Sequence, residues 1–524
     1  MHPCLNVDEI LRLLACELVV SGAKVAIVAL ACCCKSFEDP VLDALWETQD
    51  QLTPLLRCLP QEVWKEDGGS FVSQLIAFVL SVLNCLIRKS FKRIPTKAEW
   101  THFRKHTRRM RNLKVDATKN LVTSGVLSAL QLRTANEPLL PRLGSFECQD
   151  ATGTLIPFIP LFLSPKTINI TITFSATSRT VMVASTIAQL STLCPYIRFV
   201  ALHLPRDPVI VDAVSGMLLA CNRDTLQAFL VDSPLTGEAR EVLYKLPRLS
   251  HVWMVVHGPI SLPPLKLPRL RGIKIEYDHN RGWLQGFRGA TLGKLKSVTF
   301  RATSMSAQIG DFLEDFQGVA LTASAQNTLS AFRFHCSQPW NPNYSSLLAF
   351  RQLTVLEIEF SCHDVCSSKV DDDIIVSLTQ AMPKLEILRL GGIPCRSLTG
   401  VTFKGLVVLA CRCLQLSKLR IHLQANSLAE VITGTEPPTS SEHITVVPGT
   451  HCALTDLQVG GTPILSASRT RLTIALVLLQ IFPRILNIEY TNPQWKGVAE
   501  TIETIRKVGC HVYHASKTHP PRLQ

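Results

Sequence analysis

Histidine and cysteine are the residues whose spacing in this chain could support metal chemistry. His102 and His106 lie four positions apart, which would place two metal ligands on one face of a helix. Short cysteine pairs also occur within residues 362–366 and 411–413, but neither has the second matching pair that a zinc site requires. No glutamate adjoins His102, and its surroundings are strongly basic. The sequence therefore predicts no metal site.

Cysteine nucleophiles are a second possibility, because the chain contains eighteen cysteines. No recognisable base singles out one of them as a nucleophile. The chain also lacks a Gly-rich phosphate loop and a nucleophile elbow. We therefore expect a protein that is not an enzyme and that holds no cofactor.

The cysteines also bear on the compartment. A chain of 524 residues is much longer than the small secreted domains built on disulfides, and its start carries Asp8 and Glu9 in place of a charged and then apolar signal segment. We expect buried thiols and a cytoplasmic and/or nuclear protein. Residues 71–87 are the only candidate for a membrane span; they are short and interrupted by polar residues, which favours a buried helix.

Positive charge is concentrated in one segment. The formal net charge is +13, yet eleven basic residues and one acid lie between Arg88 and Lys114, and four further bases follow Glu503. Apolar residues at helical spacing predict an amphipathic basic helix over residues 99–114. Its basic patch consists of Arg104, Lys105, Arg108, Arg109 and Arg111. A solvated helix face is the simplest interpretation; a nuclear-localisation signal, an acidic partner and nucleic acid are the alternatives.

A repeated pattern, apolar-x-x-apolar-x-apolar, positions most of the remaining side chains. It recurs thirteen times from residue 143 onward, and the stretch of chain from one copy to the next is long enough for one strand and one helix. Alternation puts the fourth and sixth positions on one face of a strand, and only stacking of the units can bury that face. The copies begin at Leu143, Thr167, Ile197, Leu226, Leu249, Leu270, Leu295, Leu329, Leu353, Leu385, Leu416, Leu454 and Ile485.

Proline supports this register. It lies two residues before the first apolar position in seven of the thirteen copies, where it ends the preceding helix and favours an extended exit. The pattern resembles the longer, irregular type of leucine-rich repeat over residues 136–492. The resemblance implies an α/β solenoid with parallel strands on the concave face and helices outside.

The first fifty residues predict three short helices. Asp8 precedes an apolar stripe of Ile10, Leu13, Leu14 and Leu18, a second apolar run covers residues 23–34, and Asp39-Pro40 would open a third helix. Together with Cys34-Lys35-Ser36-Phe37 and the final Leu45-Trp46, this segment resembles an F-box, although Asn6-Val7-Asp8 replaces the usual Leu-Pro. The chain as a whole is similar to F-box proteins with leucine-rich repeats that are abundant in basidiomycete fungi.

The resemblance implies a substrate-recognition subunit of an SCF-type ubiquitin ligase, acting by protein binding in ubiquitin-dependent degradation. The F-box would dock on a Skp-type adaptor and, through it, a cullin ligase. A non-catalytic repeat scaffold, or a basic-helix binder of nucleic acid or an acidic partner, is the alternative. The expected adaptor-binding residues are Leu5, Ile10, Leu13, Cys33, Phe37, Pro40, Leu45 and Trp46.

The target is expected on the fifth position of each repeat, counted from the first apolar residue, because this position points away from the core residues on either side. The mixed character of this row suits a polypeptide better than a phosphate backbone. The expected target-binding residues are Trp253, Lys274, Arg333, Glu357, Arg389, Arg420 and Glu489.

The expected domain organisation has four parts. They are an F-box-like domain (residues 1–50), a helical linker with the basic amphipathic helix (51–135), the solenoid (136–492), and a C-terminal cap with a basic tail (493–524).

Overall fold

All thirteen repeat segments predicted from the sequence are β-strands in the computed structural model. In every copy the fourth and sixth positions lie within or at the edge of the strand, and their side chains face inward in nearly all copies. The strands are β5 (Ser145–Asp150), β6 (Asn169–Phe174), β7 (Phe199–His203), β8 (Ala228–Val231), β9 (His251–Val256), β10 (Gly272–Tyr277), β11 (Ser297–Ala302), β12 (Ala331–Cys336), β13 (Val355–Phe360), β14 (Ile387–Gly392), β15 (Lys418–Ile421), β16 (Asp456–Val459) and β17 (Asn487–Tyr490).

The chain divides into two units, residues 1–254 and 255–524. The structure describes residues 7–66, 89–118, 122–134, 137–150, 152–257, 267–278, 284, 287, 290, 292–303, 312–322, 324–338, 340–361, 370–392, 400–425, 452–459, 464, 468–490 and 492–518. The predicted apolar segment at residues 71–87 lies outside the described residues. Among the described residues, no helix combines the length and apolar character that crossing a membrane requires.

The first unit contains a run of parallel strands in the order β1-β4-β5-β6-β7-β8-β9, where β1 is Thr48–Gln49 and β4 is Asn112–Asp116. Equivalent repeat positions are paired across neighbouring strands, so that Leu113 is opposite Phe146, which is opposite Ile170. All three side chains are buried. Parallel strands that share a register in this way place one apolar row against the helices.

The prediction of a single helix over residues 99–114 was wrong. The helix α6 spans Lys97–Thr107, and the segment continues into strand β4. The cause is that Met110, Leu113 and Val115 are spaced as in every other repeat, apolar-x-x-apolar-x-apolar, and all three are buried. The parallel strands therefore begin ahead of residue 136.

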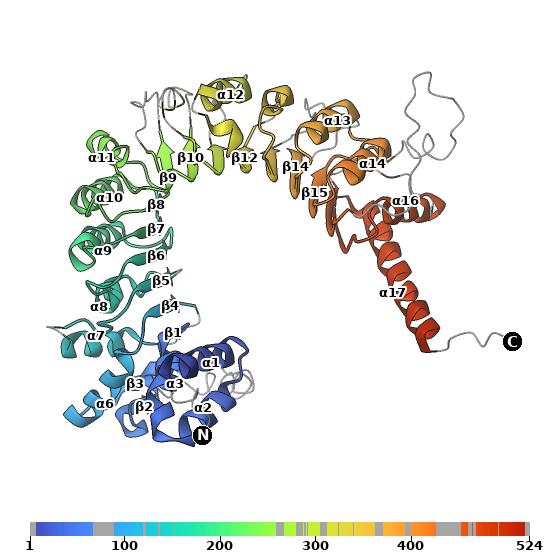
Figure 1. Ribbon diagram of the computed structural model, residues 1–524. Helices are drawn as coiled ribbons and strands as arrows, with labels where there is room; N and C mark the ends of the chain where they lie inside the picture. Colours follow the sequence, from blue (N-terminus) through green and yellow to red (C-terminus); the bar gives the residue numbers. More distant parts are fainter. Residues whose placement is uncertain are drawn as a thin grey trace, which may run out of the picture. The chain divides into compact units, whose positions relative to one another are not determined.

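Helices lie along one side of the strands in the first unit (Figure 1). Burial of their apolar faces against the sheet stabilises them, at about 1.5–3 kcal/mol for each large side chain removed from water. The elements after β4 are α7 (Ser124–Arg133), η3 (Ile156–Phe158), α8 (Ile159–Phe162), α9 (Thr180–Leu193), α10 (Pro208–Ala220) and α11 (Gly237–Leu243).

The second unit repeats this arrangement, with parallel strands in the order β10 to β17 and helices between them. Its interior contains a cluster of phenylalanine rings in which Phe316 contacts Phe300, Phe332 and Phe350 at centroid distances of 5.2 to 5.7 Å. The helical elements are α12 (Phe312–Thr322), η5 (Ala325–Asn327), η6 (Tyr344–Leu347), α13 (Asp372–Ala381), α14 (Phe403–Arg412), α16 (Ser468–Ile481), η8 (Pro493–Trp495) and α17 (Lys496–Thr518).

Helix α13 has a well-defined N-terminus. Asp371 is its N-cap, and the Asp371 carboxylate accepts a hydrogen bond of 3.0 Å from the Ile374 amide. The predicted fold class, an α/β solenoid of stacked leucine-rich-type repeats, is confirmed by the strands and helices of both units.

Candidate functional site

Three helices at the start of the chain form a module with a core of its own. They are α1 (Asp8–Val20), α2 (Lys24–Cys33) and α3 (Lys35–Glu47), followed by α4 (Thr53–Leu56), η2 (Gln61–Val63) and an antiparallel pair, β2 (Trp64–Glu66) with β3 (Lys89–Phe91). The buried residues that define the module core are Leu11, Ala15, Ile27, Phe37, Val41 and Ala44. Parts of α3 contact α6 and the segment after it, through Trp46 with His106 and through Asp39 and Asp43 with Arg109; the helix surfaces outside these contacts are available to another molecule.

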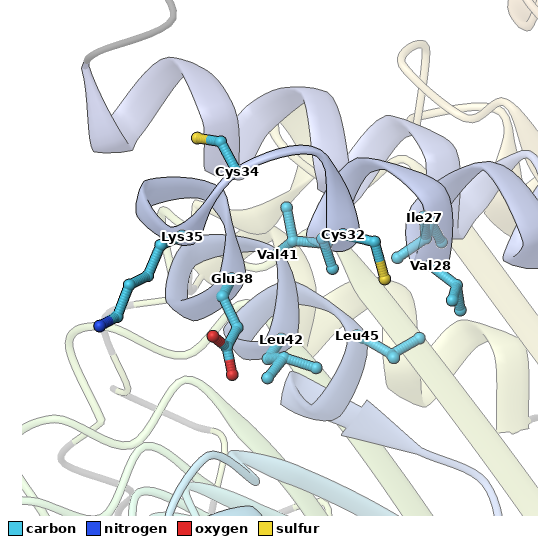
Figure 2. A pocket seen from close by; sticks show the side chains of 10 residues that line it. Ile27, Val28, Cys32, Cys34, Lys35, Glu38, Val41, Leu42 and Leu45 are labelled. Carbon is cyan, nitrogen blue, oxygen red and sulfur yellow. The ribbon is translucent and has the colours of Figure 1, made fainter.

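A groove of about 510 Å³ runs between α2 and α3 on the surface of this module (Figure 2). Its lining is mainly apolar, with Val28 and Cys32 from α2 and Leu42 and Leu45 from α3, while Lys35 and Glu38 supply charge. Figure 2 shows the Leu42 and Leu45 side chains on α3. An apolar groove with a few charged groups is the type of surface that accepts an apolar segment of a partner.

The predicted adaptor-binding residues that the structure describes divide into three groups. Ile10, Leu13 and Cys33 are exposed, with 68% exposure at Leu13, and Pro40 and Leu45 are half-buried. Phe37 and Trp46 are buried, with exposed fractions of 4% and 8%. Leu5 lies outside the described residues.

Burial gives Phe37 and Trp46 a role inside the protein. Phe37 belongs to the module core, and the Trp46 ring packs on His106 of α6 at a centroid distance of 4.7 Å. Neither side chain could contact a partner without opening the structure. Their expected place on the docking surface is therefore corrected, and they support that surface from within.

One local prediction about the module was wrong. Helix α3 begins at Lys35 instead of at Asp39-Pro40, so Pro40 lies inside it. On α1 the core-facing residues are Leu11 and Ala15. Ile10 and Leu13 point outward, as a place on a docking surface requires.

The fifth repeat positions form a continuous row on the strand surface of the second unit. The registers place them opposite one another from strand to strand. The residues of this row are Lys274, Thr299, Arg333, Glu357, Arg389, Arg420, Gln458 and Glu489. Most are half-buried; Glu357 is buried and Glu489 is exposed. The predicted row thus exists as one ladder of paired positions. Within it the Glu357 side chain is buried and offers little surface to a partner.

Ion pairs cross the strands at the centre of this row. Arg333 Nε donates to Glu357 at 2.9 Å, and Arg420 Nη1 donates to Glu359 at 2.5 Å. Arg389 lies between these pairs, 3.6 Å from Glu357 and 3.7 Å from Glu359. We call these five residues the arginine–glutamate network.

Hydrogen bonding and charge shape the titration of this network. His335 donates to Glu359 at 3.2 Å, and this bond, together with the charges of Arg420 and Arg389, lowers the pKa of Glu359. Burial lowers the pKa of Arg420, which nevertheless stays charged near neutral pH. Sequence reasoning missed Glu359 and His335, which occupy the seventh position of their repeats; that position also points outward.

Trp253 belongs to the first unit, where it occupies the fifth position of β9 opposite Leu230. It is half-buried, and its ring makes an edge contact with His203 at a centroid distance of 5.4 Å. His203 in turn lies 3.3 Å from Asp232. The indole is therefore held in place by neighbouring strands and still presents part of its surface.

The basic patch is largely paired with acids of the same unit. Arg109 forms ion pairs with Asp39 and Asp43 of α3, and Arg104 lies 2.5 Å from Glu137. Arg111 is 3.9 Å from Glu47. Lys105 and Arg108 are exposed and have no ion-pair partner among the residues that the structure describes. The arginines thus attach the three-helix module to the start of the strands, and little of the patch is left for a polyanion.

The histidine pair considered for metal chemistry is engaged in ring packing. His102 and His106 lie 5.1 Å apart in an edge contact, and burial lowers the pKa of His106. Within the described part of the chain, no group of three or more histidine, cysteine, aspartate or glutamate residues could hold a metal ion. Cys362 and Cys366 lie outside the described residues.

Comparisons with known proteins give only distant similarity. No protein-family model and no curated protein sequence matches the chain. The Rad7 and Elc1 complex of yeast is 14% identical, with a TM-score of 0.33 over 60% of this chain and 86% of that one. A Bacteroides fragilis protein is 11% identical, with a TM-score of 0.27 over 53% of this chain and 68% of its own.

The LRIM1/APL1C complex is 10% identical, with a TM-score of 0.20 over 79% of this chain and 70% of that one. All of these identities and TM-scores are low. These similarities by themselves therefore assign neither a fold nor a function to the chain.

Proposed function

We propose that this protein recruits a protein target to an SCF-type ubiquitin ligase, with the three-helix module docking on a Skp-type adaptor and, through it, on a cullin. The observation that carries this proposal is the apolar groove between α2 and α3, which lies on a module with a core of its own. Val28 lines the groove at 55% exposure, and Leu13 of α1, at 68% exposure, is a further exposed apolar side chain of the same module. Burial of such side chains is what drives association.

The proposed role is positioning, without bond chemistry in this chain. The module would hold the solenoid beside a ubiquitin-loaded enzyme, and the strand surface would hold the target. Joining the two raises the effective concentration of target lysines at the enzyme. The resemblance of the sequence to F-box proteins with leucine-rich repeats agrees with this division of labour.

The adaptor contacts are proposed to come from Ile10, Leu13, Cys33, Pro40 and Leu45. The target contacts are proposed to come from Trp253 on the first unit and from the charged row on the second. A mixed row with a buried glutamate and paired arginines fits a folded or extended polypeptide better than a uniform phosphate backbone.

Capture of a purified Skp-type adaptor by the full chain tests the proposal. Wild type should bind, and the double substitution Leu13→Ser with Val28→Ser should weaken binding at least about tenfold, because both side chains are exposed and apolar. Leu132→Ser on α7 is a matched control, since Leu132 is 81% exposed and lies outside the module. Equal melting temperatures of the three proteins would show that folding is unchanged.

If wild type captures no adaptor, or if the double variant binds as well as the control, the docking proposal fails. A free-standing repeat scaffold or a basic binder then becomes the better account. Retention on heparin that falls with salt, and that is lost when Lys105 and Arg108 are changed to Ala, would favour the basic binder.

A further inference from the structure

We propose that Arg389 anchors an acidic side chain of the protein target, in a hollow formed by β14, β15, β16 and β17; this inference rests on the proposed function and specifies its target surface. The starting point is the charge of the arginine–glutamate network. It contains Arg333, Arg389 and Arg420 but only Glu357 and Glu359. Three guanidinium groups therefore share two carboxylates within the network.

Arg389 makes the longest ion pairs of the network. Arg333 and Arg420 hold the two glutamates at 2.9 Å and 2.5 Å, whereas Arg389 approaches them only to 3.6 Å and 3.7 Å. These longer separations exceed hydrogen-bond distance. Among the residues that the structure describes, Arg389 has ion pairs but no side-chain hydrogen bond. A guanidinium carries five N–H donors in a fork that matches a carboxylate, so Arg389 has donors available for a hydrogen-bonded carboxylate beyond its two longer ion pairs.

Solvent reaches Arg389 through a hollow. The side chain is 32% exposed and lines a space of about 70 Å³. Lys418 and Arg420 line the same hollow, and this volume is large enough for several water molecules and hence for a carboxylate group. An entering carboxylate would meet the three bases that line the hollow, Arg389, Lys418 and Arg420.

Two acids in the lining of the hollow limit what can bind. Asp456 and Glu489 line it together with the bases, and Asp456 accepts hydrogen bonds from Asn487 at 2.8 Å and from Thr455 at 2.7 Å. These acids would repel a second negative charge on the same ligand. The hollow therefore suits a single aspartate or glutamate within a polypeptide, and disfavours a polyanion such as nucleic acid.

Selection of a displayed random peptide library on the full-length protein tests this inference. We expect the selected peptides to share an aspartate or glutamate. Arg389→Gln should weaken their binding about tenfold or more, as should exchanging that acidic residue for its amide. Arg351→Gln serves as the control, because Arg351 is exposed and lies outside the hollow. The double change, in protein and peptide together, should cost little more than either single change.

Selected peptides without an acidic residue, binding that Arg389→Gln leaves intact, or failure to select any peptide would each overturn the inference. Arg389→Gln leaves Arg333 and Arg420 to pair the two glutamates, and its melting temperature reports any loss of folding. Adaptor capture is read separately. A chain that binds acidic peptides but no adaptor would therefore refute the proposed function while leaving this site in place.

Discussion

The imidazole of His422 lies directly against Gly391, so that a Cβ atom on that glycine would come within 2.8 Å of His422 Cδ2. Gly391 also has φ of +105°, which a residue with a side chain rarely adopts. Its position in β14 thus requires glycine twice over, for space and for backbone conformation.

We therefore expect Gly391→Ala to reduce the free energy of unfolding by about 1–3 kcal/mol. Gly293→Ala is the control, because no heavy atom lies within 4 Å of a Cβ built there. Urea unfolding followed by circular dichroism measures both. Equal midpoints for the two variants would contradict this reading of the contact.

His422 should also make stability depend on pH. Its Nε2 donates to the Gly392 carbonyl at 3.1 Å, and burial lowers the pKa of His422 below its ordinary value of 6.5. As pH falls below about 6.5, His422 binds a proton in the unfolded chain but not yet in the folded chain. Stability contributed by the neutral ring is thus present above this pH and is lost below it. From pH 7.5 to 5.5, the free energy of unfolding, measured with urea, should fall more for the wild type than for His422→Gln. Equal falls for the two proteins would disprove this.

Arg109 should stabilise the attachment of the three-helix module. Its guanidinium pairs with Asp39 and Asp43 and donates to the Asp39 carbonyl at 3.1 Å, and its side chain is only 18% exposed. Because both acids are partly in solvent, we expect Arg109→Ala to cost about 1 kcal/mol. Arg108→Ala, at an exposed position, should change stability by less than about 0.5 kcal/mol. Urea unfolding of the pair decides the matter, and indistinguishable curves would count against the attachment.

Neighbouring residues of one strand should differ sharply in their effect on folding. Phe332 is fully buried in the phenylalanine cluster, whereas Arg333 is on the strand surface. Phe332→Ala should cost about 3–5 kcal/mol because it leaves a cavity, and Arg333→Ala about 1 kcal/mol or less. Thermal and chemical denaturation compare the two. A similar loss of stability from both substitutions would mean that Phe332 does not lie in the core while Arg333 lies on the surface.

Cys34 should be a fast-reacting thiol. Its sulfur lies 2.8 Å from the Ser36 hydroxyl, and this hydrogen bond, with the amides of Phe37 and Ser36, lowers the pKa of Cys34. Burial instead raises the pKa of Cys58 to about 11. A disulfide reagent at neutral pH should therefore modify Cys34 well before Cys58, and Ser36→Ala should slow the reaction several-fold. Cys34→Ser assigns the fast phase; if that phase survives, it belongs to another cysteine.

The sequence pattern predicts the strands because folding depends on the same residues that form the pattern. Each repeat must bury its fourth and sixth positions, so apolar residues recur at these positions in every repeat and can be recognised in the sequence. The exception was β4, where Met110, Leu113 and Val115 also fit a helical period and follow directly on a real helix. The spacing of a short apolar segment fits both a helix and a strand, and pairing with a neighbouring strand decides between them.

The candidate sites are less predictable because they depend on relations between strands or helices. The expectation for Arg389 named the right row, but its two long ion pairs, to Glu357 and Glu359, emerged only from the register of β13 and β14. The groove likewise requires the packing of α2 on α3. Phe37 was expected on the surface because its residue type suits both an anchor and a core, and spacing alone does not distinguish them.

The register of the parallel strands has a consequence for how such a protein changes over time. Positions four and six of each strand maintain the fold, while most side chains at position five lie outside the core. At the centre of the row, Glu357 is buried and Arg389 and Arg420 pair with Glu359 of position seven, so a substitution there affects several strands at once. Towards the ends of the row, a substitution at position five alters the surface of one strand and leaves the packing beneath it intact. On the proposed target surface, new specificities can therefore accumulate strand by strand at the ends of the row, while the centre changes only as a set.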